Sequence, residues 1–353
     1  MHQYGFAVVG TGNISAAHID SIERLPNARL VGVLGRSPEQ ARDLARKHDA
    51  KAYDDLNSLV ADDEVEVVCV CTPSGAHLEP AVAAAQAGKQ VVVEKPLEVT
   101  VERARRIIEA AEQAGVKLAT IFMARFSDSH RLLKRTIEAG ELGRLLQADA
   151  SVKWYRSQAY YDSSDWRGTW ALDGGGALMN QAIHAVDMLL WLMGPIQEVF
   201  AYAATLAHER LEVEDTLVAV LRYANGGLGQ LSAATSLFPG QPKVMDIHGD
   251  KGYVRVKDDS IEQWQLAGVS DEERERLLGR YSAQASGTFS DPMAMSFENH
   301  RRQLEEFLRA VETDVGPLVD GYEGLRSVEV AEAIYRSART GAPVELATRD
   351  RDR

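Results

Sequence analysis

YGFAVVGTGNIS, residues 4–15, runs apolar, breaks at two glycines and resumes as a helical pattern. This order of strand, turn and helix is typical of a dinucleotide-binding site, because Gly10 permits the tight turn and Gly12 lets backbone N–H groups approach a pyrophosphate. The positive end of a helix beginning near Asn13 would face that anion. Ser15 stands where the usual pattern has its third glycine. An ordinary strand-to-helix turn is the alternative that so short a pattern leaves open.

Short apolar strands alternate with helical patterns over residues 1–123. Strands that are apolar along their whole length are typical of a parallel sheet covered by helices on both faces. The pattern therefore predicts an N-terminal Rossmann domain with a doubly wound parallel sheet. The expected strands are residues 4–9, 30–34, 52–53, 65–71, 91–93 and 117–121.

After Met123 the strands become longer and alternate between apolar and polar residues. This two-residue period predicts a C-terminal α+β domain, residues 124–353, with a large, mostly antiparallel sheet that has one exposed or partner-facing side. The polar residues 268–296 are expected to form a lid, a subunit contact or a loose excursion. The expected strands are residues 145–155, 198–207, 215–223, 229–235, 244–249, 253–257 and 261–265, and two helices, 297–312 and 321–340, follow.

Composition narrows the classes of function. With 52 acidic against 39 basic residues, the chain of 353 residues carries a net charge of −13, which gives no electrostatic footprint for nucleic acid or an anionic membrane. It lacks both a run of about 18 apolar residues and a secretory leader pattern, so we expect a cytoplasmic protein. Cys69 and Cys71 lie two apart in a predicted strand, a spacing that favours buried, reduced thiols over a disulfide. No metal site is predicted.

Two loops follow apolar strands of the first domain. Residues 72–77, Thr-Pro-Ser-Gly-Ala-His, come after the fourth strand, at the sheet edge where open α/β sheets bind ligands. We expect this loop to contact the cofactor, although Thr72 or Ser74 could instead cap the next helix. Glu94-Lys95-Pro96 follows the fifth strand, and a lysine there can polarise a carbonyl or hydroxyl oxygen. A surface ion pair of Lys95 with Glu94 is the alternative.

Asn180, His184 and Asp187 have the spacing of one face of an α-helix, which follows a glycine run at residues 174–176. Histidine is a suitable general base for an alcohol near neutral pH, and the glycines would let the backbone approach a ligand. A structural histidine is the alternative. The preceding loop supplies aromatic rings and donors that could hold a polyol or simply pack in a core or interface: Tyr155, Tyr160, Tyr161, Trp166, Arg167 and Trp170.

Together these motifs resemble the glucose–fructose oxidoreductase, inositol dehydrogenase and rhizopine-catabolism family, Gfo/Idh/MocA, over nearly the whole chain. The resemblance implies a nicotinamide-dependent oxidoreductase that acts on a hydroxyl of a sugar or cyclitol, or reduces the matching ketone. The matching motifs are Gly10-Thr11-Gly12-Asn13-Ile14, Thr72-Pro73 with His77, Glu94-Lys95-Pro96, Arg125-Phe126, Trp166-Arg167, and Gly174-Gly175-Gly176 with Asn180 and His184.

The resemblance implies that Lys95 orients the hydroxyl and stabilises the developing alkoxide while His184 removes its proton. Many members have aspartate where this chain has Asn180, so a positioning role is expected for this residue. The residues expected at the substrate are Lys95, Tyr155, Trp170, Asn180 and His184. Those expected at the cofactor are Gly10, Gly12, Asn13, Ile14, Arg36, Ser37, Thr72, Pro73, Ser74, His77, Glu94, Lys95, Arg125, Trp166 and Arg167.

The end of the second strand bears on cofactor choice. NAD sites usually place an acidic residue there, whereas an arginine favours the 2′-phosphate of NADP. Here the strand is followed by Gly35, Arg36 and Ser37, which favours NADP and leaves NAD open.

Three alternatives remain open at the level of sequence: a dihydrodiol substrate, a nucleotide-linked sugar oxidised at its 3-position, and a non-catalytic sensor of dinucleotide or sugar. A nucleotide sugar would need a second anion site, for which Lys153, Arg156 and Arg167 are candidates. The exposed sheet face predicts a homodimer or homotetramer.

Overall fold

The computed structural model describes residues 2–281 and 297–347. The chain divides into two units, which are described separately. The first comprises Met1–Met123 and Phe297–Val328, and the second comprises Ala124–Ser296 and Glu329–Arg353. Phe297–Val328 thus belongs to the first unit although it follows most of the second in sequence.

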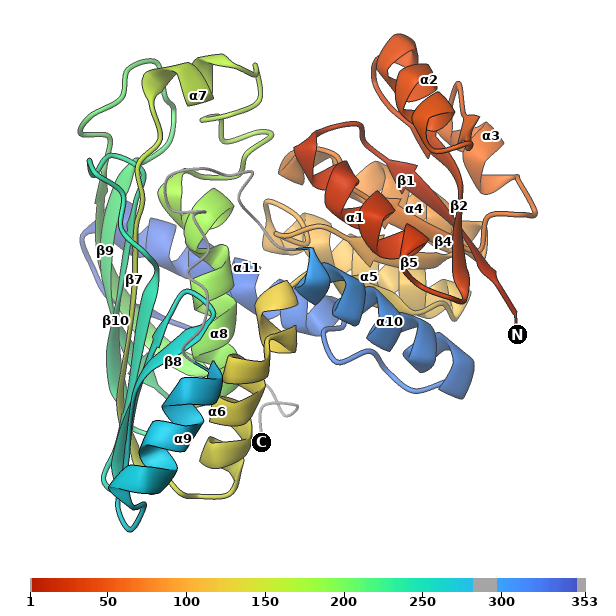
Figure 1. Cartoon of the computed structure of the whole chain (residues 1–353). Coiled ribbons are helices and arrows are strands. Elements are labelled where there is room, and N and C mark those ends of the chain that lie inside the picture. Colours follow the sequence, from red (N-terminus) through yellow and green to blue (C-terminus); the bar gives the residue numbers. More distant parts are fainter. Residues whose placement is uncertain (1, 282–296, 348–353) are drawn as a thin grey trace. The chain divides into compact units, whose positions relative to one another are not determined.

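The described part of the first unit contains a parallel sheet of six strands in the order β3-β2-β1-β4-β5-β6 (Figure 1). The order reverses beside β1, which is the topology of a doubly wound nucleotide-binding sheet. The predicted Rossmann fold is therefore confirmed. The strands are β1 (Tyr4–Val9), β2 (Ala28–Leu34), β3 (Lys51–Ala52), β4 (Val67–Val70), β5 (Gln90–Val93) and β6 (Leu118–Thr120).

Alternate residues of the strands pack in two buried cores, one on each face of this sheet. In β1, Ala7 and Val9 belong to the core with Ile107 of α5, whereas Phe6 and Val8 belong to the core with Phe307 of α10. The late helix α10 thus completes the first unit. Its helices are α1 (Asn13–Glu23), α2 (Pro38–Lys47), α3 (Leu56–Val60), α4 (Leu78–Gln86), α5 (Val101–Ala114), α10 (Glu298–Thr313) and the first part of α11 (Gly321–Thr340).

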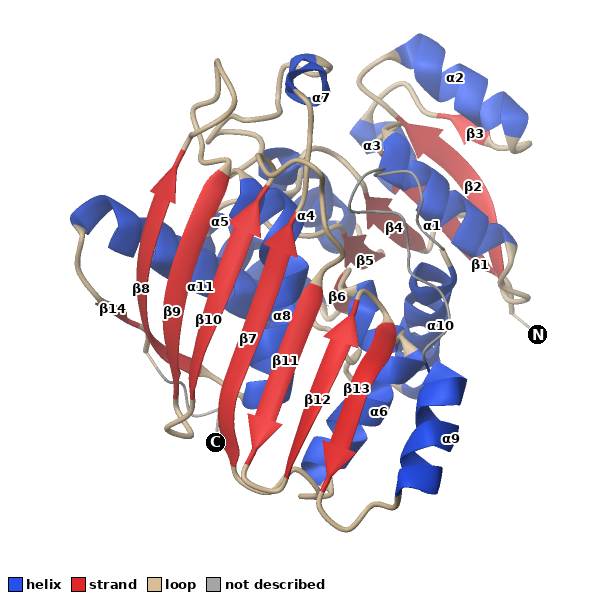
Figure 2. Ribbon diagram, turned by 60° about the vertical axis from the view of Figure 1, so that its left-hand side comes forward, coloured by secondary structure: helices blue, strands red, loops and turns tan. Residues whose placement is uncertain are grey.

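The second unit contains, in its described part, a sheet of eight strands in the order β13-β12-β11-β7-β10-β9-β8-β14 (Figure 2). Strand β7 pairs with β10 in parallel, and the other neighbours are antiparallel. The prediction of a mostly antiparallel sheet is confirmed. The strands are β7 (Leu145–Lys153), β8 (Ile196–Ala204), β9 (Thr216–Tyr223), β10 (Leu228–Ala234), β11 (Val244–Gly249), β12 (Gly252–Lys257), β13 (Ser260–Leu266) and β14 (Val344–Glu345).

Helices α6 and α8 cover one face of this sheet, and Figure 2 shows its other face in front, with no helix drawn over it. Helix α9 lies within residues 268–296, for which a lid, a contact or a loose excursion was expected, and packs beside β13. Residues 282–296 of that segment lie outside the described residues. The helical elements of the unit are α6 (Asp128–Glu138), α7 (Gln158–Asp162), the π-helix η3 (Ala177–Ala182), α8 (Ile183–Met193), α9 (Asp271–Tyr281) and the second part of α11.

Within residues 2–281 and 297–347, no helix combines the length and the apolar character needed to cross a membrane.

Candidate functional site

The turn after β1 contacts the end of β4. Gly10 has φ +120°, and a Cβ built on it would lie 2.4 Å from the carbonyl oxygen of Cys71. Only glycine therefore fits at this position. Because β1 and β4 are parallel neighbours, the turn and the loop that follows β4 share one edge of the sheet.

The N-terminus of α1 has room for an anion. Gly12 is its N-cap residue and supplies no side-chain cap, and the first turn carries no acidic residue. A Cβ on Gly12 would have no atom of the described residues within 4 Å. Uncapped amide groups and open space fit a pyrophosphate. Asn13 is exposed, Ile14 is half-buried, and Ser15 is buried with its hydroxyl donating to the Gly12 carbonyl at 2.5 Å.

Arg36 and Ser37 follow β2 at the same edge of the sheet. The Ser37 hydroxyl accepts a hydrogen bond from the N–H of Gln40 at 3.3 Å and so caps α2. Arg36 is exposed. Ser37 thus has a local role in the fold, whereas Arg36 can reach an external ligand.

The loop after β4 is fastened to the segment after β5 by His77. Its Nδ1 lies 2.9 Å from the Pro96 carbonyl oxygen and its Nε2 lies 3.0 Å from the Thr72 carbonyl oxygen. Burial lowers the pKa of His77, so the neutral ring donates to one of these oxygens. Pro73 and the buried Ser74 lie between the two ends of this loop.

The helix cap that was the alternative role for Thr72 or Ser74 is not formed on α4 among the described residues. The Thr72 hydroxyl donates to the Ala76 carbonyl at 2.9 Å. The N–H of Leu78, at the start of α4, donates instead to Glu98 Oε1 at 3.3 Å. The Thr72 hydroxyl therefore stabilises the loop itself, whereas Glu98 satisfies an amide at the N-terminus of α4.

Glu94 is buried, and both its carboxylate oxygens have protein partners. Oε1 lies 2.9 Å from His18 Nε2 and 3.8 Å from His300 Nε2, while Oε2 accepts the N–H of Lys95 at 3.1 Å. Burial acts to raise the pKa of Glu94, but the hydrogen bond and charge of His18, with His300 and Lys95, hold it at about 2. An ionised carboxylate therefore lies directly beside Lys95.

His18 completes this buried group from α1. Desolvation acts to lower its pKa, but Cys71, Cys69 and Glu94 raise it well above the ordinary value. Both cysteines are free thiols, in agreement with the expectation. In the sequence, the only signal was a histidine among the inward-facing positions of α1, and we did not single it out.

In the second unit, Asn180 and His184 do not lie in one regular α-helix. The prediction that they share one face of an α-helix was therefore wrong. Asn180 lies in the π-helix η3, whereas His184 and Asp187 lie in α8. A π-helical turn has more residues than an α-helical one, so two residues that are four apart, such as 180 and 184, do not lie directly above one another as they would in an α-helix. Asn180 and His184 are half-buried, and Asp187 is buried.

Asn180 has a carboxylate neighbour, Asp173, that was not among the predicted site residues. Its side-chain amide donates to Asp173 Oδ1, and the other oxygen of Asp173 accepts the N–H of Gly168 at 2.9 Å. The Asn180 oxygen accepts from Gln181 Nε2 at 3.0 Å, and the same nitrogen lies 3.2 Å from the Tyr160 hydroxyl. The orientation of Asn180 is thus fixed on both sides. Asp173 directly precedes the glycine run, which was the available signal.

Asp187 and Arg125 form a buried, bidentate ion pair. The two bonds measure 3.0 Å from Nε and 2.6 Å from Nη2, and the guanidinium also lies 5.5 Å from the centre of the Trp191 ring. Paired arginine and carboxylate groups of this kind tie elements firmly together. The cofactor contact predicted for Arg125 stays a prediction.

The glycine run lies against protein groups. A Cβ on Gly176 would lie 1.7 Å from the carbonyl oxygen of Glu214, and one on Gly175 would lie 2.1 Å from the Tyr335 hydroxyl. We expected these glycines to admit a ligand. In the structure, Glu214 and Tyr335 occupy the space beside them, and no sequence pattern pointed to these two residues.

The loop before the glycine run brings two arginines to one aromatic ring. The Arg156 and Arg167 guanidinium carbons lie 5.7 and 4.3 Å from the centre of the Tyr160 ring. Arg167 also lies 5.3 Å from the Trp166 ring centre. Arg156 Nη1 also donates to the Tyr155 carbonyl oxygen at 2.9 Å, and Arg167 Nη1 donates to the Tyr160 carbonyl oxygen at 3.1 Å. Stacking and these bonds hold both guanidinium groups in place. The two aromatic residues predicted at the substrate have ring neighbours, Tyr155 beside Phe238 and Trp170 beside Tyr335.

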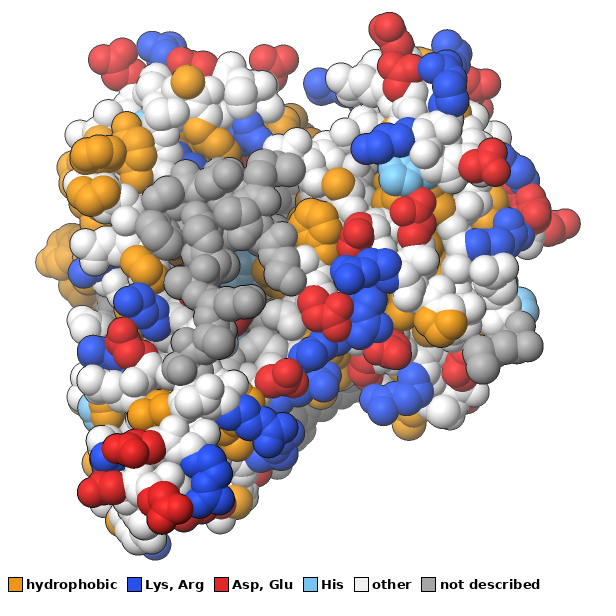
Figure 3. All heavy atoms as spheres, in the orientation of Figure 1, with side chains coloured by type: hydrophobic (Ala, Val, Ile, Leu, Met, Phe, Trp, Pro, Cys, Tyr) orange, Lys and Arg blue, Asp and Glu red, His pale blue; other side chains and the backbone are white. Residues whose placement is uncertain are grey.

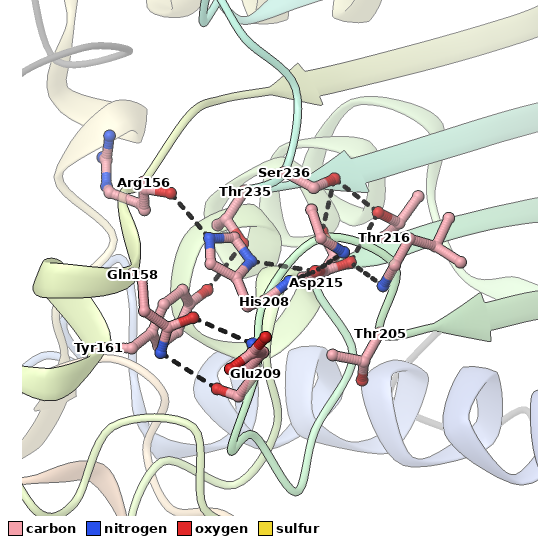
Figure 4. A network of polar contacts seen from close by, with 12 residues as sticks. Arg156, Gln158, Tyr161, Thr205, His208, Glu209, Asp215, Thr216, Thr235 and Ser236 are labelled. Atoms are coloured by element: carbon pink, nitrogen blue, oxygen red, sulfur yellow. Dashed lines mark hydrogen bonds and ion pairs between the residues drawn. The ribbon is translucent and has the colours of Figure 1, made fainter.

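A polar network connects this loop to the ends of β9 and β10 (Figure 4). Asp215 accepts the N–H groups of residues 206, 207 and 208, and His208 Nε2 lies 2.8 Å from the Arg156 carbonyl oxygen. The hydroxyls of Tyr161 and Thr235 lie 2.7 Å apart. These bonds fix the loop that carries Tyr160 and the two arginines. Tyr161 was expected only as an aromatic ring of the loop, and no sequence pattern indicated this network.

Basic and acidic side chains are interspersed on the face that Figure 3 shows. Among the described residues, no group of three or more His, Cys, Asp and Glu side chains is arranged to hold a metal ion.

Comparison with known proteins identifies the family of both parts of the chain. Residues 4–122 match the family described as the oxidoreductase family, NAD-binding Rossmann fold, and residues 134–346 match its C-terminal alpha/beta domain. Myo-inositol 2-dehydrogenase of Thermotoga maritima is 27% identical over 96% of this chain and 97% of its own.

Two solved structures extend the comparison. The WlbA dehydrogenase from Bordetella pertussis, in complex with NADH and UDP-GlcNAcA, is 34% identical over 99% of both chains, with a TM-score of 0.89. The structure of levoglucosan dehydrogenase in complex with NADH and levoglucosan matches 98% of this chain and 100% of its own, with a TM-score of 0.87. At 23% identity, this similarity shows a shared fold only. The chain belongs to the Gfo/Idh/MocA family of NAD(P)-dependent oxidoreductases, whose members are dehydrogenases or reductases that act on CH–OH groups.

Proposed function

We propose that this protein transfers a hydride between a nicotinamide and a hydroxyl-bearing carbon of a sugar, cyclitol or related polyol. One observation carries the proposal. The open N-terminus of α1, the loop after β4 and Lys95 after β5 all lie at the carboxyl edge of one parallel sheet. An edge of this kind binds a dinucleotide and brings a cationic donor to the same place.

The fit to a dinucleotide rests on the uncapped amides of α1 and on the space at Gly12. When bound, the nicotinamide supplies the acceptor or donor of the hydride. Lys95 donates a hydrogen bond to the substrate oxygen and stabilises negative charge that develops there. The charge of Lys95 is one of the causes that hold the pKa of the neighbouring Glu94 carboxyl low.

His184 acts as the general base for oxidation and as the general acid for reduction. An imidazole suits both directions, because its pKa ordinarily lies near neutrality. Asn180 is neutral and does not take the proton; held by Asp173 and Gln181, it positions the substrate or the imidazole.

The substrate class that we place first is a nucleotide-linked sugar with an acidic group. The observation that favours it is the pair of guanidinium groups of Arg156 and Arg167 around Tyr160. Guanidinium groups bind phosphate and carboxylate through fixed, paired donors. The similarity to the WlbA dehydrogenase, whose complex contains UDP-GlcNAcA, points the same way. Uncharged sugars and inositols come second, and a dihydrodiol third.

For the cofactor, we propose that Arg36 favours NADP and that NAD remains an alternative. Arg36 is exposed at the end of β2, and acidic residues are absent from positions 35–37. Relatives differ on this point, since the WlbA dehydrogenase structure contains NADH and a D-xylose 1-dehydrogenase of Haloferax volcanii, 28% identical, is named for NADP.

We also propose a homo-oligomer, in which a second copy covers the outer face of β8, β9 and β10. Apolar side chains are exposed along this face: Tyr202, Val218, Val220 and Leu228. An exposed apolar patch of this sort marks an interaction surface. Light scattering on the protein and on a Val220→Lys variant tests this, since the variant should be smaller in solution. A monomeric parent protein would contradict it.

The activity itself is tested by the absorbance of the reduced nicotinamide. NAD and NADP are each offered with UDP-linked hexuronic acids, free sugars and inositols. Turnover with one class supports the proposal and identifies the cofactor. A bound dinucleotide without turnover on any of these substrates would favour the non-catalytic sensor instead.

A further inference from the structure

Glu214 caps the beginning of the segment that carries Asn180 and His184. It lies in the connection that precedes β9. Its Oε2 accepts the N–H of Gly176 at 3.0 Å, and its Oε1 accepts the N–H of Leu178 at 2.8 Å. Its own carbonyl oxygen accepts the N–H of Ala177 at 3.1 Å. One residue thus satisfies three consecutive amides of a helical start.

Tyr335, from α11, completes this cap. Its hydroxyl accepts the N–H of Met179 at 3.3 Å and donates to Glu214 Oε1 at 3.1 Å. The next amide, that of Asn180, bonds to the Gly176 carbonyl at 3.0 Å, and the intrahelical bonding begins there. A helix start normally leaves its first amides unsatisfied, and here all four have partners outside the helix.

This cap requires the glycines before it. Side chains at Gly175 and Gly176 would overlap Tyr335 and Glu214. Glu214 and Tyr335 are both buried. The first turn of the segment is therefore held from the β-sheet side by one acidic residue and from α11 by one tyrosine, in a geometry that leaves little freedom.

We propose that Glu214 is a positioning residue, which with Tyr335 fixes the π-helical turn so that Asn180 and His184 are presented in their reactive arrangement. This inference rests on the proposed function, since it takes these two residues as parts of the reacting site. A π-helical turn is less stable than an α-helical one and needs tertiary contacts to persist. Glu214 and Tyr335 supply such contacts at its first turn.

The cap depends on protonation. Burial raises the pKa of Glu214 to about 7, against the opposing effect of the amides of Leu178 and Gly176. Two titratable groups of the described residues interact with it: the hydroxyl of Tyr335, whose pKa is raised well above the ordinary value, and that of Tyr161, whose pKa is also raised. Both phenols stay neutral near pH 7, so the titration there is that of Glu214. The ionised carboxylate accepts both amides, whereas protonation turns one acceptor oxygen into a donor.

Steady-state kinetics of Glu214→Gln test this. We expect kcat to fall roughly 10- to 100-fold with KM nearly unchanged, because misplacing a reacting group affects the reaction more than binding. The ratio of the parent kcat to that of Glu214→Gln should rise from pH 6 to pH 8, since the amide of glutamine mimics the protonated acid at every pH. Glu209→Gln is the matched control: it changes an exposed carboxylate of the same connection and should leave kcat unchanged.

Amide hydrogen exchange supplies a readout that needs no substrate. In Glu214→Gln and in Tyr335→Phe, the amides of residues 176–179 should exchange faster than in the parent, with exchange in the first unit unchanged. Equal exchange in parent and variants, or a kcat ratio that is flat with pH, would overturn the inference. If the parent shows no turnover with any substrate, the proposed function fails, while the exchange measurement still decides whether Glu214 and Tyr335 hold this turn. Tyr322→Phe, on the same helix, controls for loss of a hydroxyl, because that hydroxyl bonds to Glu112.

Discussion

The carbonyl oxygen of Glu214 occupies the place where a side chain on Gly176 would begin, 1.7 Å from the position of its Cβ. Backbone atoms cannot move aside as a flexible side chain can. We therefore expect Gly176→Ala to destabilise the protein by roughly 3 kcal/mol, as overpacking of a tight interior does. Urea unfolding measures this. Gly279→Ala is the control, because a Cβ there meets no described atom within 4 Å and should change stability by about 1 kcal/mol or less. An equally stable Gly176→Ala would refute the close packing.

The low pKa of Glu94 predicts that the free energy of unfolding depends on pH in the acidic range. Its pKa of about 2 in the fold lies below the ordinary 4.5, so its contribution is present above pH 4.5 and is lost as the pH falls toward 2. We expect Glu94→Gln to be about 3 kcal/mol less stable than the parent at pH 7, because it leaves His18 without its buried partner.

The difference between the parent and Glu94→Gln should shrink as the pH falls below 4.5, and urea unfolding at several pH values shows whether it does. Glu23→Gln removes an exposed partner of His48 and serves as the control, with an expected loss below about 1 kcal/mol. A difference for Glu94→Gln that is constant from pH 7 to pH 3 would contradict the ionised, buried carboxylate.

Because Asn180 and Asp173 are hydrogen-bonded to each other, we expect that their amide and carboxylate side chains can be swapped between the two positions. Asn180→Asp would put two carboxylates in contact, and one of them would then hold a proton because like charges oppose ionisation. We expect kcat/KM to fall about tenfold in Asn180→Asp and in Asp173→Asn, as for other changes next to a functional group. The double variant exchanges the two groups and should recover to within a few-fold of the parent. Additive losses in the double variant would show that the pair does not act as a unit.

The exposed side chain of Arg36 at the end of β2 predicts a preference for NADP over NAD. We expect Arg36→Ala to raise the KM for NADP about tenfold, since one charged contact with a phosphate is lost, and to change the KM for NAD far less. Arg46→Ala, on α2, removes an exposed arginine paired with Asp43 and should affect neither cofactor. Equal losses for NAD and NADP in Arg36→Ala would mean that this side chain does not contact the 2′-phosphate.

The fold could largely be predicted from the sequence, because its signals are local. The glycine turn after β1, the apolar parallel strands and the alternating strands of the second sheet all leave periodic patterns. Helix α9 was missed, since its polar sequence carries no apolar stripe and none of its side chains is buried. The return of α10 to the first unit is a tertiary relationship that periodicity does not encode.

The site was harder to predict, because its supports come from distant positions. Lys95, Asn180 and His184 are recognisable by motif, but Glu214 and Tyr335 meet the glycine run only in the folded chain. The π-helical turn also changes what a spacing of four residues means. A motif can therefore identify the residues proposed to react, while the residues that orient them emerge only from the structure.

The most direct test of the account is a single assay of the parent, Lys95→Ala and His184→Ala for formation of reduced nicotinamide with UDP-linked hexuronic acids, free sugars and inositols. Titration of the dinucleotide, monitored by fluorescence, verifies that each protein still binds its cofactor. We predict turnover with one substrate class in the parent and a loss of at least about a thousandfold in kcat in both variants, as expected for removal of a general base or of the donor to a developing alkoxide. Turnover that survives in both variants would contradict the assignment of Lys95 and His184 as the reacting groups.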